Sequence, residues 1–154
     1  MSFNTFSLHE SLLRGIEGFG FQKPTPIQEE AIPLALEGQD LLASAATGSG
    51  KTAAFALPIF ERLRTRERGT TRALIVTPTR ELAAQIEIHF KKLGRHTSVR
   101  CASVFGGVGM EPQRKALTSG IDVIVATPGR LLDHLQRSDL RLDGVEMLVL
   151  DEAD

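Results

Sequence analysis

Five short apolar runs recur along the chain and predict the strands of one sheet. They are DLLASA (40–45), RALIVT (72–77), VRCASVF (99–105), DVIVAT (122–127) and EMLVLD (146–151). Apolar positions in these runs are nearly continuous rather than alternating, which is typical of strands covered on both faces. We therefore expect a buried sheet rather than a sheet with one face in water.

The segments between these runs have the apolar spacing of helices. Helices are predicted at about 51–64, 79–93, 110–119 and 128–137. Strands and helices alternating at this distance predict βαβ units, and hence an α/β fold with a mainly parallel sheet and helices on both faces. Right-handed crossovers would place the carboxyl ends of all strands at one edge, where open α/β folds bind their ligands.

Two more helices are predicted before the first run. SLHE (7–10) has the pattern of a capping box that opens a helix. TPIQ (25–28) opens a second helix, with Pro26 at its first position and Gly38 at its end.

Composition and charge restrict the class of protein. The chain has 154 residues, of which 42% are hydrophobic and 24% charged, and this predicts a single globular domain. Its 18 basic and 19 acidic residues give a net charge of −1, so any basic surface for nucleic acid must be local. A single cysteine excludes an internal disulfide. With no leader-like start and no long apolar run, these features predict a cytoplasmic protein without a membrane partner.

The four histidines show no metal-ligand spacing. His89 and His134 are expected on the surfaces or edges of helices, and we assign no role to them.

The segment AATGSGKT (45–52) lies between a predicted strand and a predicted helix, which is the setting of a Walker A phosphate loop. Gly48 and Gly50 would let the backbone curl so that its amides surround the α- and β-phosphates of a nucleotide. Lys51 would reach the β- and γ-phosphates, and the Thr52 hydroxyl would bind Mg²⁺. The alternative interpretation is a glycine turn before a helix.

Three carboxylates follow the last apolar run. Asp151 has the position of the aspartate that holds Mg²⁺ through water, and Glu152 could orient and deprotonate the attacking water. The metal would also lower the repulsion of these two groups and Asp154. The alternative is a solvated acidic chain end.

Six motifs in this order resemble one protein family. They are GFQKPTPIQ (20–28), AATGSGKT (45–52), PTRELAAQ (78–85), GG (106–107), TPGR (127–130) and DEAD (151–154). Over essentially its whole length, the chain resembles the first RecA-like domain of DEAD-box ATP-dependent RNA helicases. The first motif resembles the family's Q motif, and Phe3 matches the isolated aromatic residue before it. Alanine at position 45 is a family trait.

The resemblance implies a domain organisation and a nucleotide site. Residues 1–38 would form a helical segment that carries the Q motif, and residues 39–154 a RecA-like P-loop domain. Gln28 would hydrogen-bond adenine while Phe21 and Lys23 pack against its faces. The implied ATP-binding residues are Phe21, Lys23, Gln28, Thr47, Gly48, Ser49, Gly50, Lys51 and Thr52; the catalytic residues are Lys51, Asp151 and Glu152; and the Mg²⁺ ligands are Thr52 and Asp151.

Two of these assignments have an alternative in the residues themselves. Gln28 could equally be the capping-box partner of Thr25, and both roles could hold in different nucleotide states. Phe3 could be a core anchor for the first helix.

The resemblance also implies contacts with the sugar-phosphate backbone of RNA, independent of base sequence. The implied residues are Pro78, Thr79, Arg80, Gly107, Thr127, Gly129 and Arg130. Hydroxyl groups, guanidinium groups and backbone amides hold phosphates without reading bases. The chain has no Trp or Tyr, so extensive base stacking is not expected. For Arg80, the alternative is a surface ion pair with Glu81 or Glu87.

The function implied by the resemblance is the ATP- and RNA-binding domain of a helicase that couples Mg-ATP hydrolysis to local unwinding of RNA. A C-terminal RecA-like domain outside this chain would complete the catalytic site. One alternative is a nucleotide-binding module that has no ATPase or helicase activity on its own. The other is a DNA translocase or another phosphate-loop enzyme of the wider superfamily, against which the Q motif argues.

The family places one further strand between the phosphate-loop strand and the DEAD strand. Residues 40–45 and 146–151 are therefore each expected to lack a ladder neighbour within this chain, which leaves backbone groups unpaired. We expect the sequence to be part of a longer chain. If it were the whole molecule, we would expect it to be destabilised, or to be completed by strand exchange with another copy.

Overall fold

The computed structural model describes residues 2–65 and 69–152 and divides into two compact units. The first, here called the helical unit, comprises Met1–Arg66 and His89–Ser98. The second, the sheet unit, comprises Glu67–Ile88 and Val99–Asp154. Asp154, the last carboxylate of the DEAD motif, lies outside the described residues.

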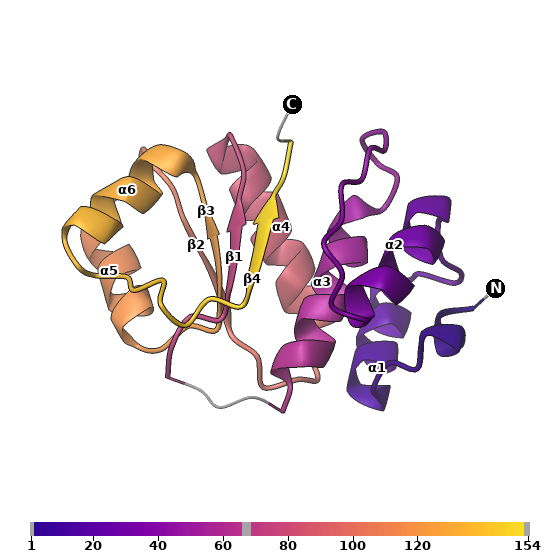
Figure 1. The fold of residues 1–154 in the computed structure, drawn as a ribbon. Coiled ribbons are helices and arrows are strands. Elements are labelled where there is room, and N and C mark those ends of the chain that lie inside the picture. The colour runs from indigo at the N-terminus through magenta and orange to yellow at the C-terminus, as the bar shows by residue number, and fades with distance from the viewer. Residues whose placement is uncertain (1, 66–68, 153–154) are drawn as a thin grey trace. The chain divides into compact units, whose positions relative to one another are not determined.

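The helical unit begins with a 3₁₀ turn, η1 (Phe3–Phe6), followed by α1 (Glu10–Phe19), α2 (Pro26–Leu36) and α3 (Lys51–Leu63) (Figure 1). The prediction for α2 is confirmed, because Pro26 is its first residue and Thr25 and Gln28 form its capping box. The chain turns away at Gly38, whose φ of 84° is accessible to glycine without strain.

The predicted start of α1 is wrong. His9 is the N-cap, and its Nδ1 accepts a hydrogen bond of 3.2 Å from the Ser11 N–H. Ser7 instead ends the 3₁₀ turn in the left-handed region, at φ 58°. A hydroxyl and an imidazole nitrogen can both satisfy a free amide at a helix start, and the 3₁₀ turn decides which residue is in position.

Aromatic rings hold the helical unit together. Phe3 is buried and stacks on Phe21, with ring centroids 6.2 Å apart, so Phe3 is a core anchor of this unit. Phe60 of α3 packs on Phe90 at 5.3 Å.

The predicted strand at 40–45 does not form. These residues have no regular structure, and the side chain of Leu42 is fully exposed. A strand is stabilised by its hydrogen-bonded neighbours, and within the described residues this segment has none. An apolar run was therefore insufficient to specify a strand here.

The sheet unit contains β1 (Ala73–Val76), β2 (Cys101–Val104), β3 (Val123–Ala126) and β4 (Met147–Leu150). The strands are parallel in the order β2-β3-β1-β4, which confirms the predicted α/β fold and four of the five predicted strands. The helices α4 (Arg80–Leu93), α5 (Met110–Thr118) and α6 (Pro128–Gln136) follow β1, β2 and β3. No helix in the described residues is long and apolar enough to cross a membrane.

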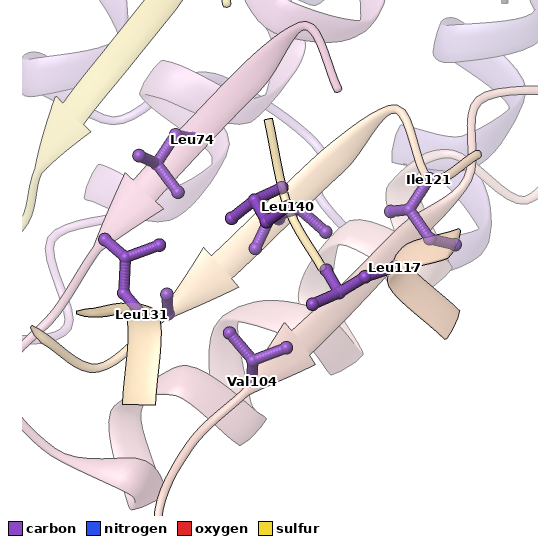
Figure 2. Close-up of a cluster of buried hydrophobic side chains, with 8 residues drawn as sticks. Leu74, Val104, Leu117, Ile121, Leu131 and Leu140 are labelled. Carbon is purple, nitrogen blue, oxygen red and sulfur yellow. The ribbon is translucent and has the colours of Figure 1, made fainter. Parts of the chain in front are cut away.

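Helices lie on both faces of this sheet. On one face, α5 and α6 enclose a buried cluster with β1, β2 and β3 (Figures 1 and 2). Its members are Leu74, Val104, Leu117, Ile121, Ile124, Ala126, Leu131 and Leu140. Ser103 is next to Val104 in β2 and so points to the other face, where it bonds Glu87 of α4.

Strand β4 is an edge strand, and the expectation that both of its faces are covered is wrong. It pairs with β1, while the side chains of Leu148 and Leu150 are exposed. Within the described residues, its other edge has no ladder partner. The proposal of a further strand between residues 40–45 and β4 stays a prediction.

Candidate nucleotide and RNA sites

The phosphate loop precedes a helix whose N-terminus is suited to anions. Gly48 and Gly50 have φ values of 81° and 87°, and α3 starts immediately afterwards at Lys51. The described first turn of α3 contains no acidic side chain, so its free amides and the positive end of its dipole are not offset by a carboxylate.

A buried glutamine, Gln28, is hydrogen-bonded to the phosphate loop. The side chain of Gln28 is 1% exposed, and its Oε1 accepts from the Thr25 N–H at 3.0 Å. Its Nε2 donates to the Gly50 carbonyl at 3.0 Å, and a Cβ on Gly50 would collide with this nitrogen. The capping alternative for Gln28 is therefore confirmed, together with a contact to the phosphate loop. Its bond to adenine stays a prediction.

The loop has features that fit a bound phosphate. The Ser49 hydroxyl is buried with no hydrogen-bond partner among the described residues. A Cβ on Gly48 would meet no described atom within 4 Å, so the space beside this backbone is open. An unpartnered hydroxyl in the loop and open space beside Gly48 are both compatible with a bound anion.

The other residues of the helical unit that were predicted to bind the nucleotide differ in their burial. Phe21 is partly buried and contacts Phe19, with ring centroids 4.5 Å apart, whereas Lys23 is exposed. Thr47 is exposed in the loop, and Thr52 is partly buried in the first turn of α3.

In the sheet unit, the predicted functional segments meet at one edge. The last residues of β1, β3 and β4 are in register, since Val76 pairs with Ala126 and with Leu150. Val104 of β2 pairs with the same Ala126. The segments that follow these strands carry PTRE, GG, TPGR and Asp151, so the prediction of a shared carboxyl edge is confirmed for these four motifs.

Asp151 is fixed at the end of β4 by two contacts with the strand beside it. Its N–H donates to the Val76 carbonyl at 2.9 Å, and its Oδ2 accepts from the Thr77 hydroxyl at 3.4 Å. Sequence reasoning missed Thr77, which is buried directly after β1; the signal was a hydroxyl at the carboxyl end of a neighbouring strand. Glu152 is exposed and has φ 55°, which is uncommon for a residue with a side chain.

Arg80 lies at the start of α4 beside the glycine doublet. Its guanidinium contacts Gly107, where any Cβ would collide with it. Its side chain is 56% exposed and pairs with Glu81 at 3.3 Å, so the alternative of a surface ion pair is confirmed with Glu81 as the partner. The pKa of Glu81 is lowered, first by a hydrogen bond from its own backbone amide and then by Arg80. Thr79 caps the same helix by accepting from the Leu82 N–H at 3.2 Å.

Arg130 differs from Arg80 because most of it is buried. Its side chain is 12% exposed, and Nη1 donates to the Val108 carbonyl at 3.0 Å and to Gln113 Oε1 at 3.1 Å. It therefore joins α6 to the loop that carries the glycine doublet. Of its neighbours in the motif, Thr127 is the N-cap of α6 and Gly129 is exposed.

The expectation that His134 lies on a helix surface is wrong. Its side chain is fully buried between Gln113 and Asp139. Helical periodicity places His134 four residues after Arg130, on the same face of α6, and this spacing was the available signal.

A family model described as "DEAD/DEAH box helicase" matches residues 25–154. The chain belongs to the DEAD/DEAH box helicase family. It is 51% identical, over all of its length, to the DEAD-box ATP-dependent RNA helicase CshA of Streptococcus pneumoniae serotype 4, and covers 29% of that protein. It is 51% identical to DEAD-box ATP-dependent RNA helicase 28 of Oryza sativa subsp. japonica, with 99% of this chain and 20% of the relative covered.

The helicase family model includes Gln28, the phosphate loop and all four motifs of the sheet unit. Phe3, Phe21 and Lys23 precede the matched region, although the similarity to CshA extends over them. The chain spans less than a third of the length of these relatives.

Proposed function

We propose that this chain is the ATP- and RNA-binding part of an ATP-dependent RNA helicase. In the whole protein, hydrolysis of Mg-ATP would drive local separation of RNA strands, with a C-terminal RecA-like domain completing the catalytic site. The observation that carries the proposal is the hydrogen bond from Gln28 to Gly50, which connects the motif assigned to adenine with the phosphate loop. The single cysteine fits the reducing cytoplasm, where we place the protein.

The phosphate loop would bind the triphosphate through its backbone amides and the N-terminus of α3. Lys51 would contact the β- and γ-phosphates, and the Thr52 hydroxyl and Asp151 would hold Mg²⁺, partly through water. The bound ion would offset charge on the phosphates. Lys51 and Thr52 belong to the helical unit and Asp151 to the sheet unit, so their joint use of one nucleotide is part of the proposal.

Glu152 would act as the general base of hydrolysis. It would accept a proton from the water whose oxygen forms the new bond to the γ-phosphorus, while the bond from that phosphorus to the β-γ bridging oxygen breaks. Its exposed position directly after Asp151 supports this role, since a base must reach a water beside the metal site.

The carboxyl edge of the sheet would bind the RNA backbone. Hydroxyl, guanidinium and amide groups of Pro78–Arg80, Gly107 and Thr127–Arg130 follow strands that are in register, and all of these residues except the partly buried Thr127 and Arg130 are exposed. Such groups position a phosphate backbone but carry no base information, so we propose binding that is independent of RNA sequence.

The central experiment measures ATP hydrolysis by the full-length protein with single-stranded RNA, with DNA of the same sequence and without nucleic acid. We expect stimulation by RNA and little by DNA. Equal stimulation by DNA would favour a translocase on DNA and contradict the RNA proposal. The same assay on this chain alone tests whether it is a binding module that needs the rest of the protein for turnover.

A nucleotide titration tests the adenine assignment separately. Phe21, Lys23 and Gln28 predict tighter binding of ATP and ADP than of GTP. Equal affinity for GTP would contradict the adenine assignment while leaving the phosphate loop intact.

A further inference from the structure

A buried polar cluster lies between α5 and α6, behind the loop of the glycine doublet. Gln113 is at its centre, and its Nε2 donates to the Phe105 carbonyl at 3.0 Å. Its Oε1 accepts from Arg130 Nη1 at 3.1 Å and faces His134 Nε2 at 3.2 Å. On its other side, His134 Nδ1 faces Asp139 Oδ2 at 3.1 Å.

The orientation of the Gln113 amide follows from its partners. A carbonyl oxygen can only accept and a guanidinium can only donate, so the amide nitrogen must face Phe105 and the amide oxygen must face Arg130. Since this oxygen also faces His134, Nε2 of the imidazole must carry a proton to form a hydrogen bond.

The second ring nitrogen of His134, Nδ1, also faces an acceptor. Arg114 Nε lies 3.2 Å from Asp139 Oδ1, and this cation favours the ionised carboxylate. An ionised Asp139 can only accept, so Nδ1 must carry a proton as well. Both ring nitrogens of His134 thus face acceptors, which is the arrangement that suits an imidazolium ion.

Charge balance supports a cationic His134. The other charged groups of the cluster come from α5, α6 and the turn after α6. Arg114 pairs with Glu111 at 3.2 Å and with Asp139, and Arg130 lies 3.9 Å from Asp133. Together with His134, the cations Arg114 and Arg130 then equal the carboxylates in number. A buried cation is tolerated when it is paired and hydrogen-bonded in this way.

We propose that His134 and Gln113 are positioning residues for Arg130 and for the loop of residues 105–108, and that His134 acts as the imidazolium. If His134 loses the Nε2 proton, a lone pair faces Gln113 Oε1. Rotation of the amide would remove this repulsion, but it would break the bond to Phe105 and turn an NH₂ group toward Arg130. Deprotonation would therefore weaken the hold of Gln113 on both Arg130 and the loop, while Arg130 would keep its bond to the Val108 carbonyl.

The first test is spectroscopic and does not depend on any activity. In the full-length protein labelled with ¹⁵N-histidine, the His134 resonances are assigned from their loss in His134→Asn. We expect both ring nitrogens to be protonated at pH 7, with the coupled imidazolium pattern. A neutral ring with one unprotonated nitrogen would overturn the proposal, whether or not any variant folds.

The second test rests on the proposed function and uses two variants of similar size and polarity. The amide nitrogen of Gln reaches the place of Nε2, and that of Asn reaches the place of Nδ1. His134→Gln keeps a donor toward Gln113, so RNA affinity should stay near wild type and not change between pH 6 and 9. His134→Asn lacks this donor, and we expect RNA binding to be about fivefold weaker.

Wild-type RNA affinity should fall toward that of His134→Asn when the pH is raised until His134 loses its second proton. Equal losses in both variants, with an unchanged pH profile, would show that His134 only fills space and would overturn the positioning role. If RNA does not bind at all, the proposed function fails, and the ¹⁵N spectrum still decides the protonation of His134.

Discussion

Gln28 in the helical unit and Arg80 in the sheet unit serve the two proposed ligands in different ways. Gln28 is buried and makes hydrogen bonds to the backbone of Thr25 and of Gly50. Arg80 is largely exposed and pairs with Glu81 next to it on the helix. The phosphate loop is thus held by a buried polar contact, whereas Arg80 makes an exposed ion pair at the start of α4.

This difference fits what each ligand needs. A triphosphate bound by backbone amides requires a loop of defined shape, and buried hydrogen bonds maintain such a shape because breaking them leaves polar groups unpaired. An RNA backbone varies in conformation, and exposed cations can follow it at small cost in ordering. Arg130, buried and bonded by Gln113, is the exception on the RNA side.

The largest effects are expected where chemistry depends on a single group. In the full-length protein, Glu152→Gln should lower ATP turnover by roughly 100-fold or more, because it removes the general base but keeps a polar side chain. Nucleotide binding should be nearly unchanged. Lys51→Ala should instead weaken binding of ATP itself. Full ATPase activity in Glu152→Gln would show that the assigned role is wrong.

A matched pair of glycine variants tests whether Gln28 shapes the phosphate loop. Gly48 and Gly50 both have positive φ, so alanine costs about 1–2 kcal/mol at either position. At Gly50 the new Cβ also collides with the Gln28 amide, whereas at Gly48 it meets open space. We therefore expect ATP affinity to fall about tenfold further in Gly50→Ala than in Gly48→Ala. Equal losses would contradict the role of the Gln28 contact.

We expect a moderate effect on RNA binding when the exposed Arg80 is replaced. Arg80→Ala should weaken RNA binding about equally for different RNA sequences, and should flatten the dependence of log affinity on log salt by about 0.7 for one lost phosphate contact. Arg137→Ala is the control, since it removes the same charge at the C-cap of α6, the end of that helix that lies away from the TPGR motif. Losses that depend on RNA sequence would point to base recognition by Arg80.

The smallest effect concerns the ion pair of Arg80. The pKa of Glu81 is lowered mainly by its backbone hydrogen bond, so Arg80→Ala should return it only part of the way to its ordinary value. A carboxyl group whose pKa is lowered by folding stabilises the fold at any pH above its ordinary pKa. This stabilisation is lost as the pH falls through the lowered pKa. An NMR titration of Glu81 measures it; a full return would make Arg80 the main cause.

The sequence by itself determined most of the local structure and the motifs on which the proposed function rests. The phosphate loop, the capping box of α2 and the motifs at the carboxyl edge follow from patterns within a few residues, and four strands formed where apolar runs predicted them. These features depend on short-range backbone preferences and on the parallel arrangement that βαβ units impose. They could be predicted because no distant contact opposes them.

Only the tertiary structure decided which apolar runs became strands and which residues surround each side chain. DVIVAT became the fully buried β3 because β1 and β2 bond it on both sides, whereas DLLASA has no ladder partner among the described residues and leaves Leu42 in solvent. Similarly, α6 begins where predicted, but the burial of His134 depends on Gln113 and Asp139, which belong to other segments. The burial of a side chain depends on residues from distant parts of the chain, and a local sequence pattern carries no information about them.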